Sequence, residues 1–184
     1  KHLKRIKWIN FGGGHHITRA DYDIARLKRC INKMADKYGL EVYLEPGEAV
    51  ALNAGELISE VLDIVENDGK IALLDASAAC HMPDVIEMPY TPPLANAGKP
   101  GEKGFDYTLA GATCLAGDVI GKYSFNAPLK IGDRVKFQDM AIYSFVKNNT
   151  FNGMPLPALA VKDKSGDCKI IKTFGYEDFK SRLG

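Results

Sequence analysis

The stretch Ile6-Lys7-Trp8-Ile9-Asn10-Phe11-Gly12-Gly13-Gly14 decides how the chain begins to fold. Its apolar run up to Phe11 is typical of a strand, and the consecutive glycines predict a tight turn. We expect the next residues, His15 to Thr18, to open a helix. Backbone N–H groups without intrahelical partners would converge there, and the missing Cβ atoms would let an anion approach. The stretch therefore predicts a phosphate-binding loop, although glycine clusters more often mark an ordinary turn.

The residues after the glycines predict a strand–helix–strand unit. Between residues 21 and 38, apolar residues recur at intervals of three and four, the pattern of an amphipathic helix that Gly39 would end. Residues 40–45 are expected to form a short strand running into a Pro46-Gly47 turn. Ligands of parallel α/β units lie at the carboxyl ends of the strands. We therefore expect the glycines and Glu45 to face one ligand from adjacent strands.

From about residue 49 onward, short apolar runs punctuated by glycine and proline replace this alternation. Residues 56–66 could form a helix on propensity, but the Asn67-Asp68-Gly69 turn and the β-rich run 70–75 favour a hairpin. A loop is expected at 88–103 and a short terminal helix at 176–183. Further strands are expected at 107–112, 119–125, 134–137, 141–146, 158–162 and 168–173. Many short strands at this spacing predict an antiparallel β-barrel or sandwich.

Four motifs follow one another along the chain. They are Gly12-Gly13-Gly14-His15-His16, Glu45-Pro46-Gly47-Glu48, Gly111-Ala112-Thr113-Cys114-Leu115-Ala116-Gly117-Asp118 and Asp139-Met140-Ala141-Ile142-Tyr143-Ser144. The series resembles the C-terminal half of the pyridoxal-phosphate decarboxylases of the alanine-racemase-like fold, the group that contains ornithine and diaminopimelate decarboxylases. Within that group it is most similar to the enzymes acting on carboxynorspermidine and carboxyspermidine, because Glu48 stands where other members carry Arg. The resemblance covers essentially the whole chain.

The resemblance implies an α/β part followed by a mostly β part. Residues 1–50 would be the last strand–helix–strand part of a TIM-like (β/α)8 barrel, and residues 51–184 a C-terminal antiparallel β-barrel or sandwich domain. A single strand–helix–strand unit cannot bury its own sheet faces, so the earlier barrel strands are expected to be missing. In the family, the Schiff-base lysine lies near the start of the full protein. We therefore expect a fragment that lacks this lysine and is inactive alone.

The matching residues imply a site for pyridoxal 5'-phosphate. Gly12 to Gly14 would bind its phosphate through backbone N–H groups, and the hydroxyl of Tyr143 would donate to the same phosphate. His15 or His16 would add a further donor. Glu45 would keep the pyridine nitrogen protonated, so that the ring accepts the electrons released when carbon dioxide leaves. Residue type alone, without the motifs, would instead favour a solvated acid at Glu45 and a core residue at Tyr143.

Three acids and one thiol are the candidates for contact with the substrate. Glu48 reverses the charge of the family's arginine. Glu87 falls near an arginine that grips a substrate carboxylate in the diaminopimelate enzymes, and an acid there would attract an amine, although an exposed acid before a loop explains it equally well. Asp118 would replace the acid that relatives carry at Leu115. Cys114 is the catalytic candidate, placed to return a proton after decarboxylation, although a free cysteine is more often a small buried hydrophobe.

The resulting prediction is the decarboxylation of carboxynorspermidine or carboxyspermidine to norspermidine or spermidine in polyamine synthesis. The partners implied are the polyamine substrate and, since the loop around the candidate thiol reaches the partner subunit in such enzymes, a second copy in an obligate homodimer with shared sites. Two alternatives stay open. One is a diaminopimelate or ornithine decarboxylase of the same fold, and the other is a noncatalytic phosphate-binding β module.

Composition argues against several other classes of protein. The chain has 24 basic and 23 acidic residues and a net charge of +1. Its longest basic cluster, Lys1 to Lys7, is short and mixed with apolar residues, so we expect no nucleic-acid partner. No apolar run reaches the ~18–20 residues that span a bilayer, so we expect no membrane partner and a cytoplasmic location. The 4 cysteines are scattered, which predicts neither a disulfide framework nor a metal site.

Overall fold

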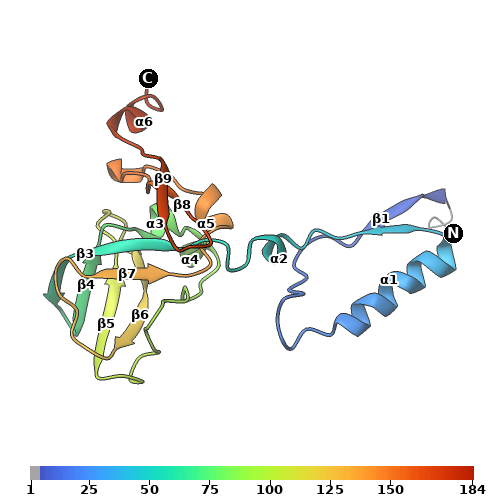
Figure 1. Cartoon of the computed structure of the whole chain (residues 1–184), viewed down its shortest axis with the longest axis horizontal. Helices are drawn as coiled ribbons and strands as arrows, with labels where there is room; N and C mark the ends of the chain where they lie inside the picture. Colours follow the sequence, from blue (N-terminus) through green and yellow to red (C-terminus); the bar gives the residue numbers. More distant parts are fainter. Residues whose placement is uncertain (1–4) are drawn as a thin grey trace. The chain divides into compact units, whose positions relative to one another are not determined.

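Two short parallel strands, one long helix and one short helix make up the N-terminal unit of the structure, a computed structural model that describes residues 5–184 (Figure 1). This unit ends at Leu52, and the C-terminal unit begins at Asn53. Strands β1 (Trp8–Asn10) and β2 (Glu41–Tyr43) pair in parallel, with α1 (Ile24–Tyr38) between them in the chain. The predicted strand–helix–strand unit is confirmed. Residues 1–4, which include most of the basic cluster Lys1 to Lys7, lie outside the described residues.

Helix α1 begins and ends at residues suited to those positions. The side chain of Asp23 caps it by accepting a hydrogen bond from the Arg26 N–H at 2.7 Å. Gly39 ends it in the left-handed conformation, with φ 67°, as the sequence predicts. Within residues 5–52 only Leu40 is buried, and the apolar face of α1 stays at most half-buried. Two strands do not identify a barrel, so the TIM-like barrel remains a prediction.

The predicted helix start after the glycines is wrong. Residues 12–23 form loop and turns, and α1 begins only at Ile24. Gly12 and Gly14 have φ values of 77° and 74°, which lie outside right-handed helical geometry. The predicted Pro46-Gly47 turn is instead the start of a short helix, α2 (Gly47–Ala51). Proline is accepted at such a start because the N–H group it lacks would have no intrahelical acceptor.

A curled five-stranded sheet is the centre of the C-terminal unit (Figure 1). Its order is β6-β5-β4-β3-β7, and its strands are β3 (Leu57–Glu66), β4 (Lys70–Leu74), β5 (Phe105–Ala110), β6 (Val119–Phe125) and β7 (Arg134–Phe137). Strands β3 and β4 form the predicted hairpin. Strands β4 and β5 pair in parallel, so the prediction of an antiparallel sheet is wrong at this pair. The long connection between them lets the chain return in the same direction.

The segment 94–98 joins the two edges of this sheet. Leu94 bridges to Phe137 of β7, and Gly98 bridges to Ser124 of β6. Both bridges lie in the segment predicted to be a proline-rich loop. The largest side chains buried in the C-terminal unit include Phe137, Leu74, Met82, Leu109, Ile120 and Val61. The structure thus supports a mostly β domain with a curled sheet, which is a coarser description than the predicted barrel or sandwich.

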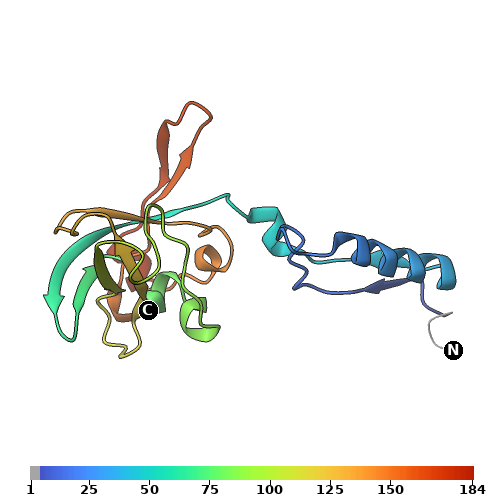
Figure 2. The ribbon, with the colours of Figure 1, turned by 90° about the horizontal axis from the view of Figure 1, so that it is seen from below.

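Short helices and a hairpin complete the C-terminal unit. Helices α3 (Ala78–His81) and α4 (Asp84–Glu87) follow β4, and α5 (Tyr143–Val146) and the 3-10 helix η2 (Phe151–Gly153) follow β7. Helix α5 replaces the strand predicted at 141–146, because the chain leaves the sheet at Asp139, whose φ is 57°. The hairpin of β8 (Leu159–Lys162) and β9 (Cys168–Lys172) projects from the sheet (Figure 2), and α6 (Tyr176–Lys180) forms as predicted. In residues 5–184 no helix has the length and apolar character needed to cross a membrane.

Candidate functional site

The glycine loop and Glu45 meet at the carboxyl ends of β1 and β2. The Glu45 N–H donates to the carbonyl of Gly12 at 3.0 Å. Asn10 joins the two, because its Nδ2 donates to Glu45 Oε1 at 2.5 Å while its Oδ1 accepts from the Gly12 N–H at 2.7 Å. The structure therefore brings together the groups that the sequence predicts to face one ligand. It also adds Asn10, which is not among the predicted residues, although a polar residue at the end of an apolar strand before glycines is a signal that could have identified it.

The loop offers backbone donors to an anion. The N–H groups of residues 13–16 donate to no acceptor within residues 5–184. A Cβ atom on Gly12 or Gly14 would meet no heavy atom within 4 Å, so an approaching group has open space there. Successive free N–H groups in a turn form an anion-binding concavity. The loop thus suits a phosphate, and the adjacent carboxylate of Glu45 suits a protonated ring nitrogen, which is the donor and acceptor set that pyridoxal phosphate requires.

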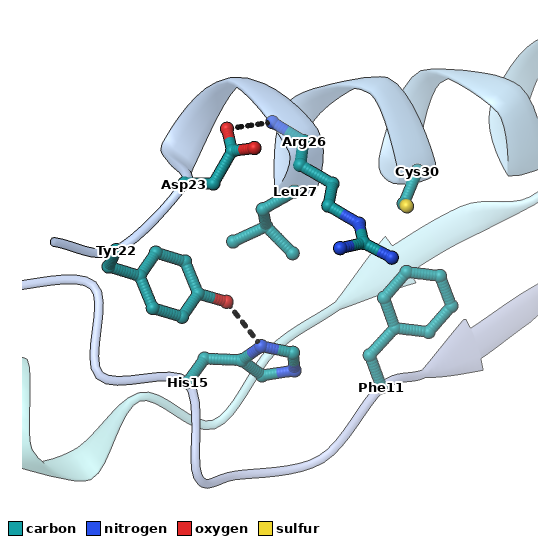
Figure 3. Close-up of a pocket in the computed structure, with 7 residues that line it drawn as sticks. All are labelled: Phe11, His15, Tyr22, Asp23, Arg26, Leu27 and Cys30. Atoms are coloured by element: carbon teal, nitrogen blue, oxygen red, sulfur yellow. Dashed lines mark hydrogen bonds between the residues drawn. The ribbon is translucent and has the colours of Figure 1, made fainter.

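A pocket of about 480 Å³ lies between the glycine loop and the first turns of α1 (Figure 3). His15 reaches it, and its Nδ1 lies 2.9 Å from the hydroxyl of Tyr22. The guanidinium of Arg26 supplies positive charge at the same pocket. The other residues that line it are Phe11, Asp23, Leu27 and Cys30. Of these residues the sequence singles out only His15, as a possible donor to the phosphate, because neither Tyr22 nor Arg26 lies in a recognisable motif.

Glu48 lies in the first turn of α2 and is paired within the N-terminal unit. Its carboxylate contacts Nδ1 of His16 and accepts a hydrogen bond from Thr18 Oγ1 at 3.3 Å. The side chain of His16 is therefore occupied by Glu48, while its backbone N–H stays available to an anion. A contact between Glu48 and the substrate remains a prediction.

Asp118 is only 4% exposed, and its carboxylate joins two segments of the C-terminal unit. At the start of α3, Ser77 Oγ and the Ala78 N–H donate to it at 2.9 and 2.7 Å. The N–H and Oγ1 of Thr113, in the loop between β5 and β6, donate to it at 3.1 and 2.6 Å. Both carboxylate oxygens are thus occupied by donors of the chain itself. These contacts do not support the predicted contact with a substrate amine and instead give Asp118 a role in holding the loop.

Cys114 is exposed in that same loop, as a thiol that exchanges protons with a substrate must be. Its backbone N–H donates to Oδ1 of Asn152, in η2, at 3.0 Å. The structure therefore brings together Cys114, Asp118 and Asn152 within the C-terminal unit. Asn152 is not predicted from the sequence, because nothing in its local sequence marks a contact with a loop 38 residues away.

Glu87 and Tyr143 lie beside one cation, Lys147. The Lys147 Nζ donates to Glu87 at 2.9 Å and to Asp84 at 2.5 Å, and these carboxylates raise the pKa of Lys147. The same Nζ lies 5.1 Å from the centroid of the Tyr143 ring. Tyr143 is exposed at the start of α5, so its interpretation as a core residue is wrong. Neither the phosphate contact of Tyr143 nor the amine contact of Glu87 is tested by these positions.

His81 is a buried titratable residue that the sequence does not single out. A backbone N–H can only donate and a carbonyl can only accept, so His81 Nδ1 accepts from the Ser77 N–H while Nε2–H donates to the Pro155 carbonyl, both at 3.0 Å. Burial lowers the pKa of His81. It therefore serves as a neutral link within the C-terminal unit. Among the described residues, no group of three or more His, Cys, Asp or Glu side chains is placed to hold a metal ion.

Known proteins resemble this chain along almost all of its length. Residues 20–141 match the family described as pyridoxal-dependent decarboxylase, C-terminal sheet domain. A carboxynorspermidine/carboxyspermidine decarboxylase of Campylobacter jejuni is 47% identical to this chain, and the match covers 99% of this chain and 50% of the length of that enzyme. A carboxyaminopropylagmatine decarboxylase of Synechocystis sp. is 42% identical to this chain, and the match covers 100% of this chain and 48% of the length of that enzyme.

A solved structure has a similar fold. The crystal structure of carboxynorspermidine decarboxylase from Campylobacter jejuni, complexed with norspermidine, matches with a TM-score of 0.87 and 46% identity. The match covers 98% of this chain and 52% of that chain. The chain thus spans about half the length of the relatives that it matches.

Proposed function

Since the chain belongs to the pyridoxal-dependent decarboxylases and contains their C-terminal sheet domain, we propose that the whole protein decarboxylates carboxynorspermidine or carboxyspermidine. The observation that carries the proposal is the 47% identity to an enzyme of that name over 99% of the chain. The match to a structure holding norspermidine supports a polyamine as the product. The reaction would be a step of polyamine synthesis.

The N-terminal unit would hold pyridoxal phosphate through its loop and Glu45. The free N–H groups of residues 13–16 would bind the phosphate, and Tyr143 would add a hydroxyl donor. When bound, the cofactor supplies a protonated pyridine ring that accepts the electron pair of the breaking Cα–carboxylate bond. Glu45 would hold the proton on the ring nitrogen, and its 2.5 Å hydrogen bond from Asn10 orients the carboxylate for that task. The lysine that carries the cofactor in the family is expected outside this chain.

Cys114 would complete the reaction by returning a proton. When the Cα–carboxylate bond breaks and carbon dioxide leaves, the substrate carbon needs a proton to form its new C–H bond. The thiol of Cys114 would donate its proton to that carbon, and solvent would then reprotonate the thiolate. In this proposal the protein is a homodimer in which the Cys114 loop of one subunit serves the site of its partner.

The acids Glu48 and Glu87 are the candidates for attracting the amine groups of the substrate. Each has a positively charged or protonatable partner in the structure, His16 and Lys147 respectively. A substrate ammonium would therefore compete with these partners for the carboxylates. A second candidate substrate is carboxyaminopropylagmatine, which the 42% identity to the Synechocystis enzyme favours.

The test is a ranking of substrates by the whole protein loaded with pyridoxal phosphate. We expect kcat/KM for carboxynorspermidine or carboxyspermidine to exceed that for carboxyaminopropylagmatine, diaminopimelate and ornithine by at least about tenfold, the effect of ~1.4 kcal/mol of differential binding. A preference for the agmatine derivative would establish the second candidate. A preference for diaminopimelate or ornithine would overturn the proposal in favour of another decarboxylase of this fold. No turnover and no cofactor absorbance would instead support a noncatalytic module.

A further inference from the structure

We propose that Asn152 and Asp118 are positioning residues that clamp the Cys114 loop from two sides, an inference that rests on the proposed proton return by Cys114. Cys114 itself is exposed, so packing does not hold its side chain in place. The backbone of the loop is held instead, at Cys114 by Asn152 and at the base of the loop by Asp118. A proton donor must lie within hydrogen-bond reach of the reacting carbon, and a misplacement of about 1 Å costs ~100-fold in rate.

The first side of the clamp depends on the unusual backbone of Asn152. Its φ and ψ values are 56° and 18°, in the left-handed region that asparagine tolerates better than most residues. In this conformation its Oδ1 accepts the Cys114 N–H at 3.0 Å. The segment around Asn152 is fixed in turn, because Asn149 Nδ2 donates to the Ala79 carbonyl at 2.8 Å. The acceptor that holds Cys114 is therefore anchored on α3.

The second side of the clamp is the buried carboxylate of Asp118. It binds Thr113, the residue before Cys114, through both the backbone N–H and the hydroxyl. It also accepts from Ser77 and Ala78 at the start of α3. Helix α3 thus supports the loop through Asp118 and supports Asn152 through Asn149. The two sides share one mostly buried element, α3, which is the arrangement expected of a support for a reactive group.

Substitutions at Asn152 separate the clamp from general stability. Asn152 is exposed, so its replacement does not open a cavity. Asn152→Gly keeps the left-handed backbone accessible and removes the acceptor, whereas Asn152→Asp keeps an acceptor oxygen. Asn96→Gly is the matched control, because Asn96 is also exposed and left-handed, with φ 62°, and lies outside the clamp.

The kinetic test uses the whole protein loaded with pyridoxal phosphate and carboxynorspermidine as substrate. We expect Asn152→Gly to lower kcat about tenfold with KM unchanged, Asn152→Asp to recover most of the loss, and Asn96→Gly to have no effect. In a Cys114→Ala background, Asn152→Gly should cause no further loss, because the group it positions is gone. An unchanged kcat, or an equal loss with and without Cys114, would overturn the proposal.

A second measurement tests the clamp without any turnover. Hydrogen exchange of the Cys114 amide should quicken about tenfold in Asn152→Gly and stay near the original rate in Asn152→Asp, because only the first removes the acceptor. Unchanged exchange in Asn152→Gly would show that the clamp does not exist. If the protein decarboxylates no substrate but the Cys114 amide of Asn152→Gly exchanges faster, the clamp exists and its proposed catalytic role is wrong. The failure of the proposed function is thereby distinguished from the failure of the clamp.

Discussion

Gly111 has no room for a side chain, which makes it a sensitive test of the buried carboxylate beside it. A Cβ atom there would lie 2.3 Å from Asp118 Oδ2 and 2.7 Å from the Cα of Ser77. We expect Gly111→Ala to lower the free energy of unfolding by about 3 kcal/mol, because it displaces a carboxylate whose donors then lose their acceptor. Urea denaturation of the chain measures this change.

Gly117→Ala is the control for that prediction, because it makes the same change in the same loop. A Cβ atom on Gly117 meets no heavy atom within 4 Å. Its free energy of unfolding should stay within about 0.5 kcal/mol of the original. Equal losses for the two variants would show that Asp118 does not hold the loop as described.

The residues of the candidate site could be predicted where a short motif at a strand end carries them. The glycines and Glu45 follow two parallel strands, and this local order alone predicts that they meet. Asn152 and Lys147 could not be predicted, because they act on Cys114 and Glu87 from 38 and 60 residues away. Such contacts depend on the tertiary path of the chain and leave no local pattern.

At the scale of elements, His81 links α3 to the segment that follows η2, and this link should make stability depend on pH. Burial lowers the pKa of His81 below its ordinary value of 6.5, outweighing the hydrogen bond to the Pro155 carbonyl and the carboxylates of Asp75 and Asp118, which act in the opposite direction. The unfolded chain therefore binds a proton at a higher pH than the folded chain does. The contribution of neutral His81 to the stability of the fold is therefore fully present above pH 6.5 and is lost as the pH falls below that value.

His81→Gln tests this pH dependence, because glutamine offers an acceptor and a donor but does not titrate. We expect the free energy of unfolding of this variant to change less with pH than that of the original chain between about pH 5 and 7. Urea denaturation at several pH values provides the comparison. An identical slope in the two proteins would assign the pH dependence to other groups.

The elements that could be predicted are those set by local turn chemistry. The β3–β4 hairpin follows from Asn67-Asp68-Gly69, where φ is positive at Asp68 and Gly69. The parallel pairing of β4 with β5 could not be predicted, because it depends on the path of the connection between them. The segment 141–146 has the apolar character of a strand, but the turn at Asp139 takes it out of the sheet and it forms α5.

At the scale of the whole molecule, the two units differ in how much core they contain. The C-terminal unit encloses a buried cluster inside its curled sheet, whereas within residues 5–52 only Leu40 is buried. The chain also spans about half the length of its relatives. The catalytic activity is therefore proposed for the whole protein, and in this proposal it would need both the loop and Glu45 of the first unit and the Cys114 loop of the second.

The measurement that tests the proposed function most directly is the release of carbon dioxide from carboxynorspermidine by the whole protein loaded with pyridoxal phosphate, with Glu45→Gln compared against Glu41→Gln. Glu41 is the matched control, because it is an exposed acid of β2, the strand that leads to Glu45, and within residues 5–184 its carboxylate accepts a hydrogen bond only from the hydroxyl of Tyr43. We predict that Glu45→Gln lowers kcat by about 100-fold and that Glu41→Gln leaves it unchanged. Equal rates for the two variants, or no carbon dioxide release by the original protein, would contradict the account.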